Sequence, residues 1–116
     1  MDGDFCDLSK VTEELDGAVA KLRDLIDETA KARVIKESHG ERCKQALHKA
    51  MAKAGADSMA KAEVMARVDP QYLAQYEQLT EDLMTAEKAL LRWSVLQTRI
   101  DGLRTKISLA KETLKL

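Results

Sequence analysis

The chain has 116 residues, 45% hydrophobic but only 3% aromatic, and its many Ala, Leu, Lys, Glu and Met residues favour helices over sheets in a single domain. It contains no apolar run long enough to cross a bilayer, and its first seven residues are acidic where a secretory signal would be basic and then apolar. The net charge is −1, and the two cysteines are too few and too widely separated for a disulfide framework, so we expect a cytoplasmic protein with Cys6 and Cys43 reduced.

The first predicted element is a helical arm over residues 9–54, with Ser9 as its N-cap. Its first apolar residues occupy two columns of a coiled-coil heptad: Leu8, Leu15 and Leu22, then Val11, Ala18 and Leu25, ending at Thr29 and Ala32. Gly40 marks either a turn or a soft point in a continuing helix. Because no Pro or loop cluster follows it, we favour the soft point, with a possible kink near residue 40.

The second half of this arm carries an apolar face and a basic row beside it. The face consists of Cys43, Leu47, Ala50, Met51 and Ala54. Arg42, Lys49 and Lys53 form the basic row at spacings of seven and four. Gly55 is the expected C′ residue of the arm. Ser58 then caps a short helix over residues 58–68, whose apolar residues are Met59, Ala62, Met65 and Val68.

The last predicted element is one long helix over residues 70–114. Asp69 and Pro70 form a favoured pairing of N-cap and first helical residue. Apolar residues then recur at steps of three or four: Leu73, Tyr76, Leu79, Leu83, Ala86, Leu90, Trp93, Leu96, Ile100, Leu103, Ile107, Ala110 and Leu114. Such a helix is about 70 Å long, so its apolar stripe must pack against other helices of this chain or of further copies.

We therefore expect homo-oligomerisation through this stripe. The stripe changes its repeat at Trp93, where two steps of three follow one another, and we expect Trp93 at a junction between packed helices. The candidate oligomerisation residues are Leu83, Leu90, Trp93, Leu96, Ile100, Leu103 and Ile107.

Charge alternates in four blocks along the chain. Residues 1–30 hold nine acids and three bases, and residues 31–67 hold four acids and nine bases. Residues 68–87 hold five acids and no base, and residues 88–116 hold two acids and seven bases. The second block has two interpretations: it pairs with acidic helices, or it binds nucleic-acid phosphates. The candidate nucleic-acid-binding residues are Lys36, Arg42, Lys44, Lys49, Lys53, Lys61 and Arg67.

Other groups of residues give weaker indications of a functional site. Tyr72 and Tyr76, one turn apart, can stack bases, although packing is the commoner role of such a pair. His39 and Cys43 share a helical face, but His48 points elsewhere, which argues against a metal site. No phosphate-binding loop, nucleophile elbow or isolated acid pair is present in the sequence, so we expect no enzyme activity and no cofactor.

Three segments give the chain a family resemblance. Residues 62–69 (AEVMARVD) lead into the long helix, which contains residues 90–93 (LLRW) and 100–106 (IDGLRTK). Together with the basic stretch that precedes them, they resemble phage recombination mediators of the UvsY type. The resemblance implies a cytoplasmic, ring-forming homo-oligomer that binds single-stranded DNA and contacts a RecA-like recombinase and a single-strand-binding protein. It also implies that the basic central helix binds DNA and the long helix drives assembly, and it assigns no individual residue.

The sequence thus predicts an all-α fold, an elongated helical hairpin or coiled-coil-like bundle of two long helices with one or two short helices between them. The predicted function is a non-enzymatic mediator that binds single-stranded DNA and assists a recombinase. The alternative is a structural coiled-coil adaptor or assembly chaperone whose charge blocks serve only helix pairing.

Overall fold

A computed structural model of the chain describes the backbone of residues 2–115 and the side chains of residues 8–114. It contains four helices, α1 (Asp2–Asp24), α2 (Ile26–Ala54), α3 (Met59–Arg67) and α4 (Pro70–Lys115), and no strand among the residues described. The predicted all-α class is confirmed. The predicted N-terminal arm is divided into α1 and α2, and α4 is the predicted long C-terminal helix. None of the helices in the described part of the chain is long and apolar enough to cross a membrane.

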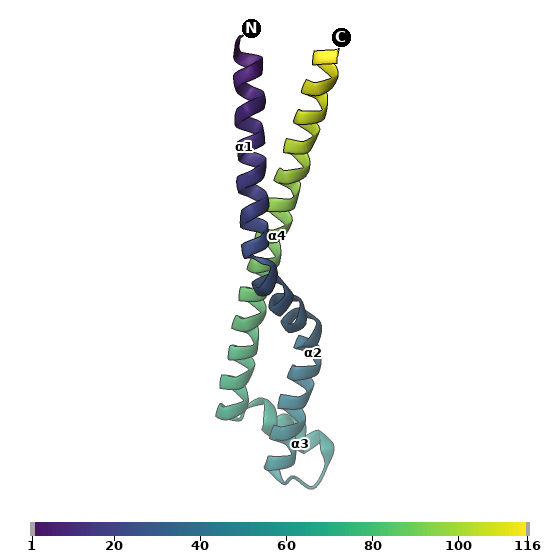
Figure 1. Ribbon diagram of the computed structural model, residues 1–116. Helices are drawn as coiled ribbons and strands as arrows, with labels where there is room; N and C mark the ends of the chain where they lie inside the picture. The colour runs from purple at the N-terminus through teal and green to yellow at the C-terminus, as the bar shows by residue number, and fades with distance from the viewer. Residues whose placement is uncertain (1, 116) are drawn as a thin grey trace. The chain divides into compact units, whose positions relative to one another are not determined.

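Contacts divide the chain into two compact units, each built on an antiparallel pair of helices (Figure 1). Unit 1 consists of Met1–Thr29 and Ala89–Leu116, so that α1 packs against the C-terminal part of α4. Unit 2 consists of Ala30–Lys88 and contains α2, α3 and the N-terminal part of α4. The single-domain expectation stays a prediction.

The N-terminal arm differs from its predicted boundaries. The first helix already contains Asp2, so Ser9 lies inside it and is not an N-cap. The arm is interrupted at Leu25, whose N–H is shared between the carbonyls of Lys21 (3.2 Å) and Leu22 (3.1 Å). This shared bond tightens one turn in the 3₁₀ manner, and regular α bonding resumes when Thr29 N donates to Leu25 O. At Gly40 the helix continues, as the soft-point interpretation expected.

The predicted caps downstream are confirmed. The left-handed Gly55 (φ 62°) follows the last residue of α2, and the Ser58 hydroxyl accepts a hydrogen bond from Lys61 N at 3.2 Å to begin α3. Asp69 Oδ2 accepts from Tyr72 N at 3.3 Å, and Pro70 is the first residue of α4. These short-range signals hold because each one satisfies a backbone group that the helix end leaves free.

Small side chains dominate the two cores. In unit 1, Ala18 packs with Ile100 and Leu103, and the predicted α1 heptad residues Val11, Leu15 and Leu22 lie against them. In unit 2 the buried cluster is Ala46, Ala50, Ala66 and Tyr72, with Leu47, Met51 and Leu79 packed against it. Alanine lets helices approach closely, which brings α2 next to the first turns of α4.

At the ends of α4 and in α3, some of the apolar residues that the sequence predicts to be buried are exposed in the structure. At the start of α4 the buried residue is Tyr72, whereas Leu73 and Tyr76 are exposed; Leu114 is exposed at the other end. In α3 the buried residues are Ala62 and Ala66, whereas Met59, Met65 and Val68 face solvent. In α3 the close helix packing buries the small residues Ala62 and Ala66 in place of the larger ones. At the start of α4 the buried position is Tyr72, one residue before the predicted Leu73.

Candidate functional site

The predicted basic row lies along one side of α2 in unit 2. Arg42, Lys49 and Lys53 are all exposed, and their spacings of seven and four place them on one side of the helix. Lys36 and Lys44 are also exposed on α2, but the helical repeat turns them away from this row. The structure therefore brings three of the predicted nucleic-acid-binding residues together.

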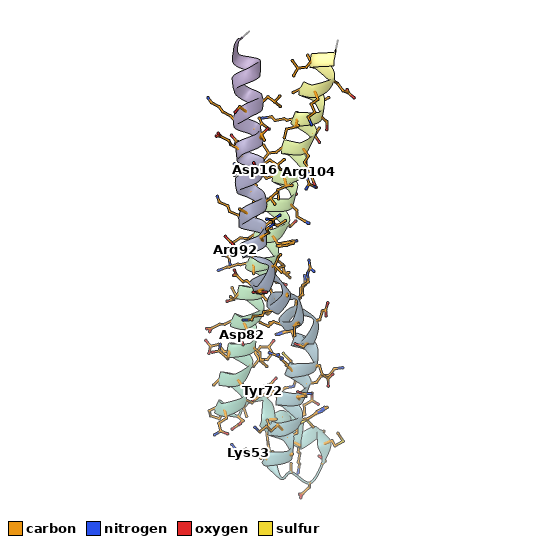
Figure 2. All side chains as sticks on the ribbon, viewed as in Figure 1. Asp16, Lys53, Tyr72, Asp82, Arg92 and Arg104 are labelled. Atoms are coloured by element: carbon orange, nitrogen blue, oxygen red, sulfur yellow. The ribbon has the colours of Figure 1, made fainter. Side chains whose placement is uncertain are left out.

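A shallow groove runs beside this row, between α2 and α4. It is lined by Arg42, Gln45, Ala46 and Lys49 of α2 and by Gln75 and Leu79 of α4, and it encloses about 230 Å³. Farther along α2, Lys53 donates a hydrogen bond to Gln71 Oε1 of α4, which ties the two helices together (Figure 2). The groove lining thus combines two cations with two neutral amides and includes no carboxylate.

The acidic block at the start of α4 does not neutralise the row. Asp82, a half-buried acid of this block, accepts a hydrogen bond from Gln78 on its own helix at 2.9 Å (Figure 2). Glu77 and Glu81 are exposed. Among the described side chains, no carboxylate lies within 4.0 Å of the amino or guanidinium groups of Arg42, Lys49 or Lys53. Their charges are therefore available to an anion from solution.

The two candidates on α3 lie in a different setting. Arg67 forms an ion pair with Glu63 at 2.7 Å, and the hydrogen bond and charge of Glu63 raise the pKa of Arg67 above its ordinary value. Lys61 lines an apolar hollow with Ala60, Val64 and Met65. These two cations consequently do not extend the α2 row.

Of the two tyrosines, Tyr72 is buried and Tyr76 is exposed. The ring centroids of Tyr72 and Tyr76 lie 6.1 Å apart at an angle of 38°, and Tyr72 is buried in the alanine cluster of unit 2 (Figure 2). Only Tyr76 exposes enough of its ring to meet another molecule. The packing role expected of such a pair therefore describes Tyr72.

The predicted oligomerisation residues lie mainly in cores of the chain itself. Leu96, Ile100 and Leu103 pack against α1 in unit 1. Leu83, Leu90, Trp93 and Ile107 are half-buried. Their role between copies stays a prediction, because α1 already covers the central part of this stripe.

In unit 1 the acidic and basic blocks meet directly. Arg92 of α4 pairs with Glu28 at 2.8 Å, and Arg99 of α4 approaches Glu14 of α1 at 3.9 Å (Figure 2). All four side chains are largely exposed, so these pairs add little stability and mainly select antiparallel partners of opposite charge.

His39 and Cys43 are neighbours on α2. His39 Nε2 lies 3.5 Å from Cys43 Sγ within one turn of α2, and Cys43 is a free thiol. No group of three or more potential ligands that could hold a metal occurs in the part of the chain that the structure describes. The side chain of Cys6 lies outside the described residues.

Sequence reasoning missed the amides of the groove. Gln71 and Gln75 lie one turn apart on α4; Gln75 lines the groove together with Gln45 of α2, and Gln71 accepts the hydrogen bond of Lys53. Their spacing can be seen in the sequence, but glutamine is common on exposed helix faces. Only the contact between α2 and α4 shows that Gln45 and Gln75 lie at the groove. Comparisons of the chain with protein families, with curated proteins and with solved structures find no match.

Proposed function

We propose that this chain is a non-enzymatic, oligomeric mediator that binds single-stranded DNA through unit 2 and assists the assembly of a recombinase. The observation that supports the proposal is the row of Arg42, Lys49 and Lys53 beside a groove without carboxylates. The recombinase and a single-strand-binding protein enter through the family resemblance alone, as does the preference for a single strand.

The proposed mechanism is electrostatic. Along the axis of α2 the three cations are separated by about 10 Å and about 6 Å, so a strand that lies along the helix can place a different phosphate beside each of them. Each phosphate contact releases condensed counterions, which makes binding strong at low salt and weak at high salt. Gln45 and Gln75 can donate to phosphate oxygens between the cations, and Tyr76 can stack a base nearby. No bond is made or broken in this mechanism.

The test is fluorescence anisotropy with a labelled single-stranded oligonucleotide and its duplex over a range of salt concentrations. Lys49→Glu plus Lys53→Glu should weaken binding of the single strand and lower the slope of log K against log salt by roughly 1.4, the value for two lost phosphate contacts on a single strand. Arg104→Glu plus Lys111→Glu makes the same charge change on exposed residues of α4 in unit 1 and is the matched control. If both variants lost the same affinity for the oligonucleotide, the effect would come from the net charge of the chain, and the proposed site would be contradicted.

A second candidate function is a structural adaptor that binds no nucleic acid. The ion pairs of Arg92 with Glu28 and of Arg99 with Glu14 favour it, because in these pairs the acidic first block and the basic last block of the chain bind each other. No oligonucleotide binding even at low salt, in a chain that remains helical by circular dichroism, would support the adaptor and overturn the mediator.

A further inference from the structure

The C-terminal part of α4 carries a second stripe of apolar residues, which is exposed to solvent. Leu91, Val95 and Leu109 are 63%, 61% and 59% exposed. Their spacings of four and fourteen place them on one face, and the exposed Thr98, Gly102 and Thr105 lie between them in the same heptad columns. The stripe is distinct from the one formed by Ile100 and Leu103, which packs against α1.

An open hollow adjoins the stripe within unit 1. It measures about 500 Å³, and its apolar lining comes from Leu91, Val95, Leu96 and the half-buried Leu25 at the helix interruption. Lys21, Asp24, Arg92 and Arg99 complete its lining. A helix laid along the stripe would therefore find both a ridge of apolar side chains and a recess beside it.

Charges of opposite sign border the two sides of the stripe. On the side of the hollow, Arg92, Arg99 and Lys106 recur at steps of seven. On the other side the corresponding heptad positions hold Ser94, Asp101 and Ser108. Neither Asp101 nor Lys106 takes part in an ion pair among the side chains described. Arg92 and Arg99 already pair with Glu28 and Glu14 of the same chain. The bordering charges without such a partner are therefore Lys106 on one edge and Asp101 on the other.

We propose that this face binds a second copy of the chain, with the two α4 helices parallel and in register. In a parallel pair, the basic edge of each helix faces the other edge of its neighbour, so Asp101 of one copy meets Lys106 of the second copy. In an antiparallel pair, the edge that carries Lys106 would face the same edge of the other copy, so Lys106 and Asp101 would not meet. Charge complementarity therefore selects both the occupant and its orientation.

This inference rests on the homo-oligomer named in the proposed function and assigns it to a different face from the stripe that packs against α1. It can fail separately. A chain that binds oligonucleotides as a monomer would overturn this inference and the oligomeric state but keep the DNA-binding role. A chain that self-associates without binding oligonucleotides would overturn the DNA-binding role alone.

Sedimentation velocity of the full chain over a range of concentrations, without DNA, tests the face. Val95→Glu should abolish concentration-dependent association, because it places a charge in the apolar stripe. Val34→Glu is the matched control, since Val34 is 58% exposed in the middle of α2 and belongs to unit 2. Circular dichroism verifies that both variants fold. A wild-type monomer at every concentration, or equal association of both variants, would overturn the proposal.

A charge exchange tests the orientation. Asp101→Lys and Lys106→Asp should each weaken association roughly three- to thirty-fold, and the double exchange should restore it. Residues five apart on one helix do not face each other, so rescue in the double variant reports a contact between copies. Additive losses in the double variant would contradict the parallel arrangement and overturn the proposal.

Discussion

Arg92 Nη2 of α4 donates a 2.8 Å hydrogen bond to Glu28 Oε1, a residue 64 positions earlier in the first turn of α2. The pair joins the helix that follows the interruption at Leu25 to the opposite helix of unit 1. Both side chains are about half exposed, so solvent screens the attraction.

We expect Arg92→Ala to lower the free energy of unfolding by no more than about 1 kcal/mol, with the loss shrinking at high salt. Urea unfolding at low and high salt measures it. Arg104→Ala is the control, because Arg104 is an exposed arginine of the same helix that forms no ion pair among the described side chains. A larger loss that persists at high salt would show that Arg92 stabilises unit 1 by packing.

A second prediction concerns Thr29, which is 3% exposed and whose Oγ1 has no hydrogen-bond partner among the described residues. An unpaired buried hydroxyl is costly, whereas the methyl group of valine fills the same volume. Thr29→Val should therefore stabilise the chain by about 1 kcal/mol in urea or thermal unfolding. The exposed Thr98 donates its hydroxyl to Ser94 O at 3.0 Å, so Thr98→Val should change stability by less than about 0.5 kcal/mol.

Two glycines should respond in opposite directions to the same substitution. Gly40 lies inside α2, is exposed, and leaves open space where a Cβ would be, so Gly40→Ala should stabilise by roughly 0.5–1 kcal/mol. Gly55 has φ 62° after the end of α2, so Gly55→Ala should destabilise by roughly 1–2 kcal/mol. Thermal unfolding of the two variants compares them directly. A stabilised Gly55→Ala variant would mean that α2 does not end in the left-handed conformation.

The cap of α4 gives a fourth prediction. Asp69→Ala removes the acceptor of the Tyr72 N–H and should cost about 1 kcal/mol, whereas Asp69→Asn keeps an acceptor oxygen and should cost much less. Chemical denaturation of both variants measures the difference. Equal losses would assign the effect to the charge of Asp69 rather than to the hydrogen bond.

The candidate site was predictable only in part. The alignment of Arg42, Lys49 and Lys53 follows from helical periodicity, which is a property of neighbouring residues. The groove beside them needs Gln75 and Leu79, which come from another helix more than 25 residues later. The predicted cations Lys36, Lys44, Lys61 and Arg67 do not join the row, because composition counts charges without stating which side of the fold they face.

The sequence by itself determined the elements whose causes are local. Gly55 predicts the C-terminus of α2, because it adopts the left-handed conformation required there. Ser58 and the Asp69–Pro70 pair predict the N-termini of α3 and α4, because Ser58 and Asp69 supply acceptors for free backbone N–H groups. The heptad of α1 also follows, because one helix face must be apolar to pack.

Only the tertiary structure decided which apolar residues are buried and where the N-terminal arm is interrupted. Leu25 has no Gly or Pro signal, and Tyr72 replaces its neighbour Leu73 in the core of unit 2. Which helix contacts which, and how closely, sets the free energy of burying each side chain. That quantity depends on residues far apart in the chain, so a local pattern cannot contain it.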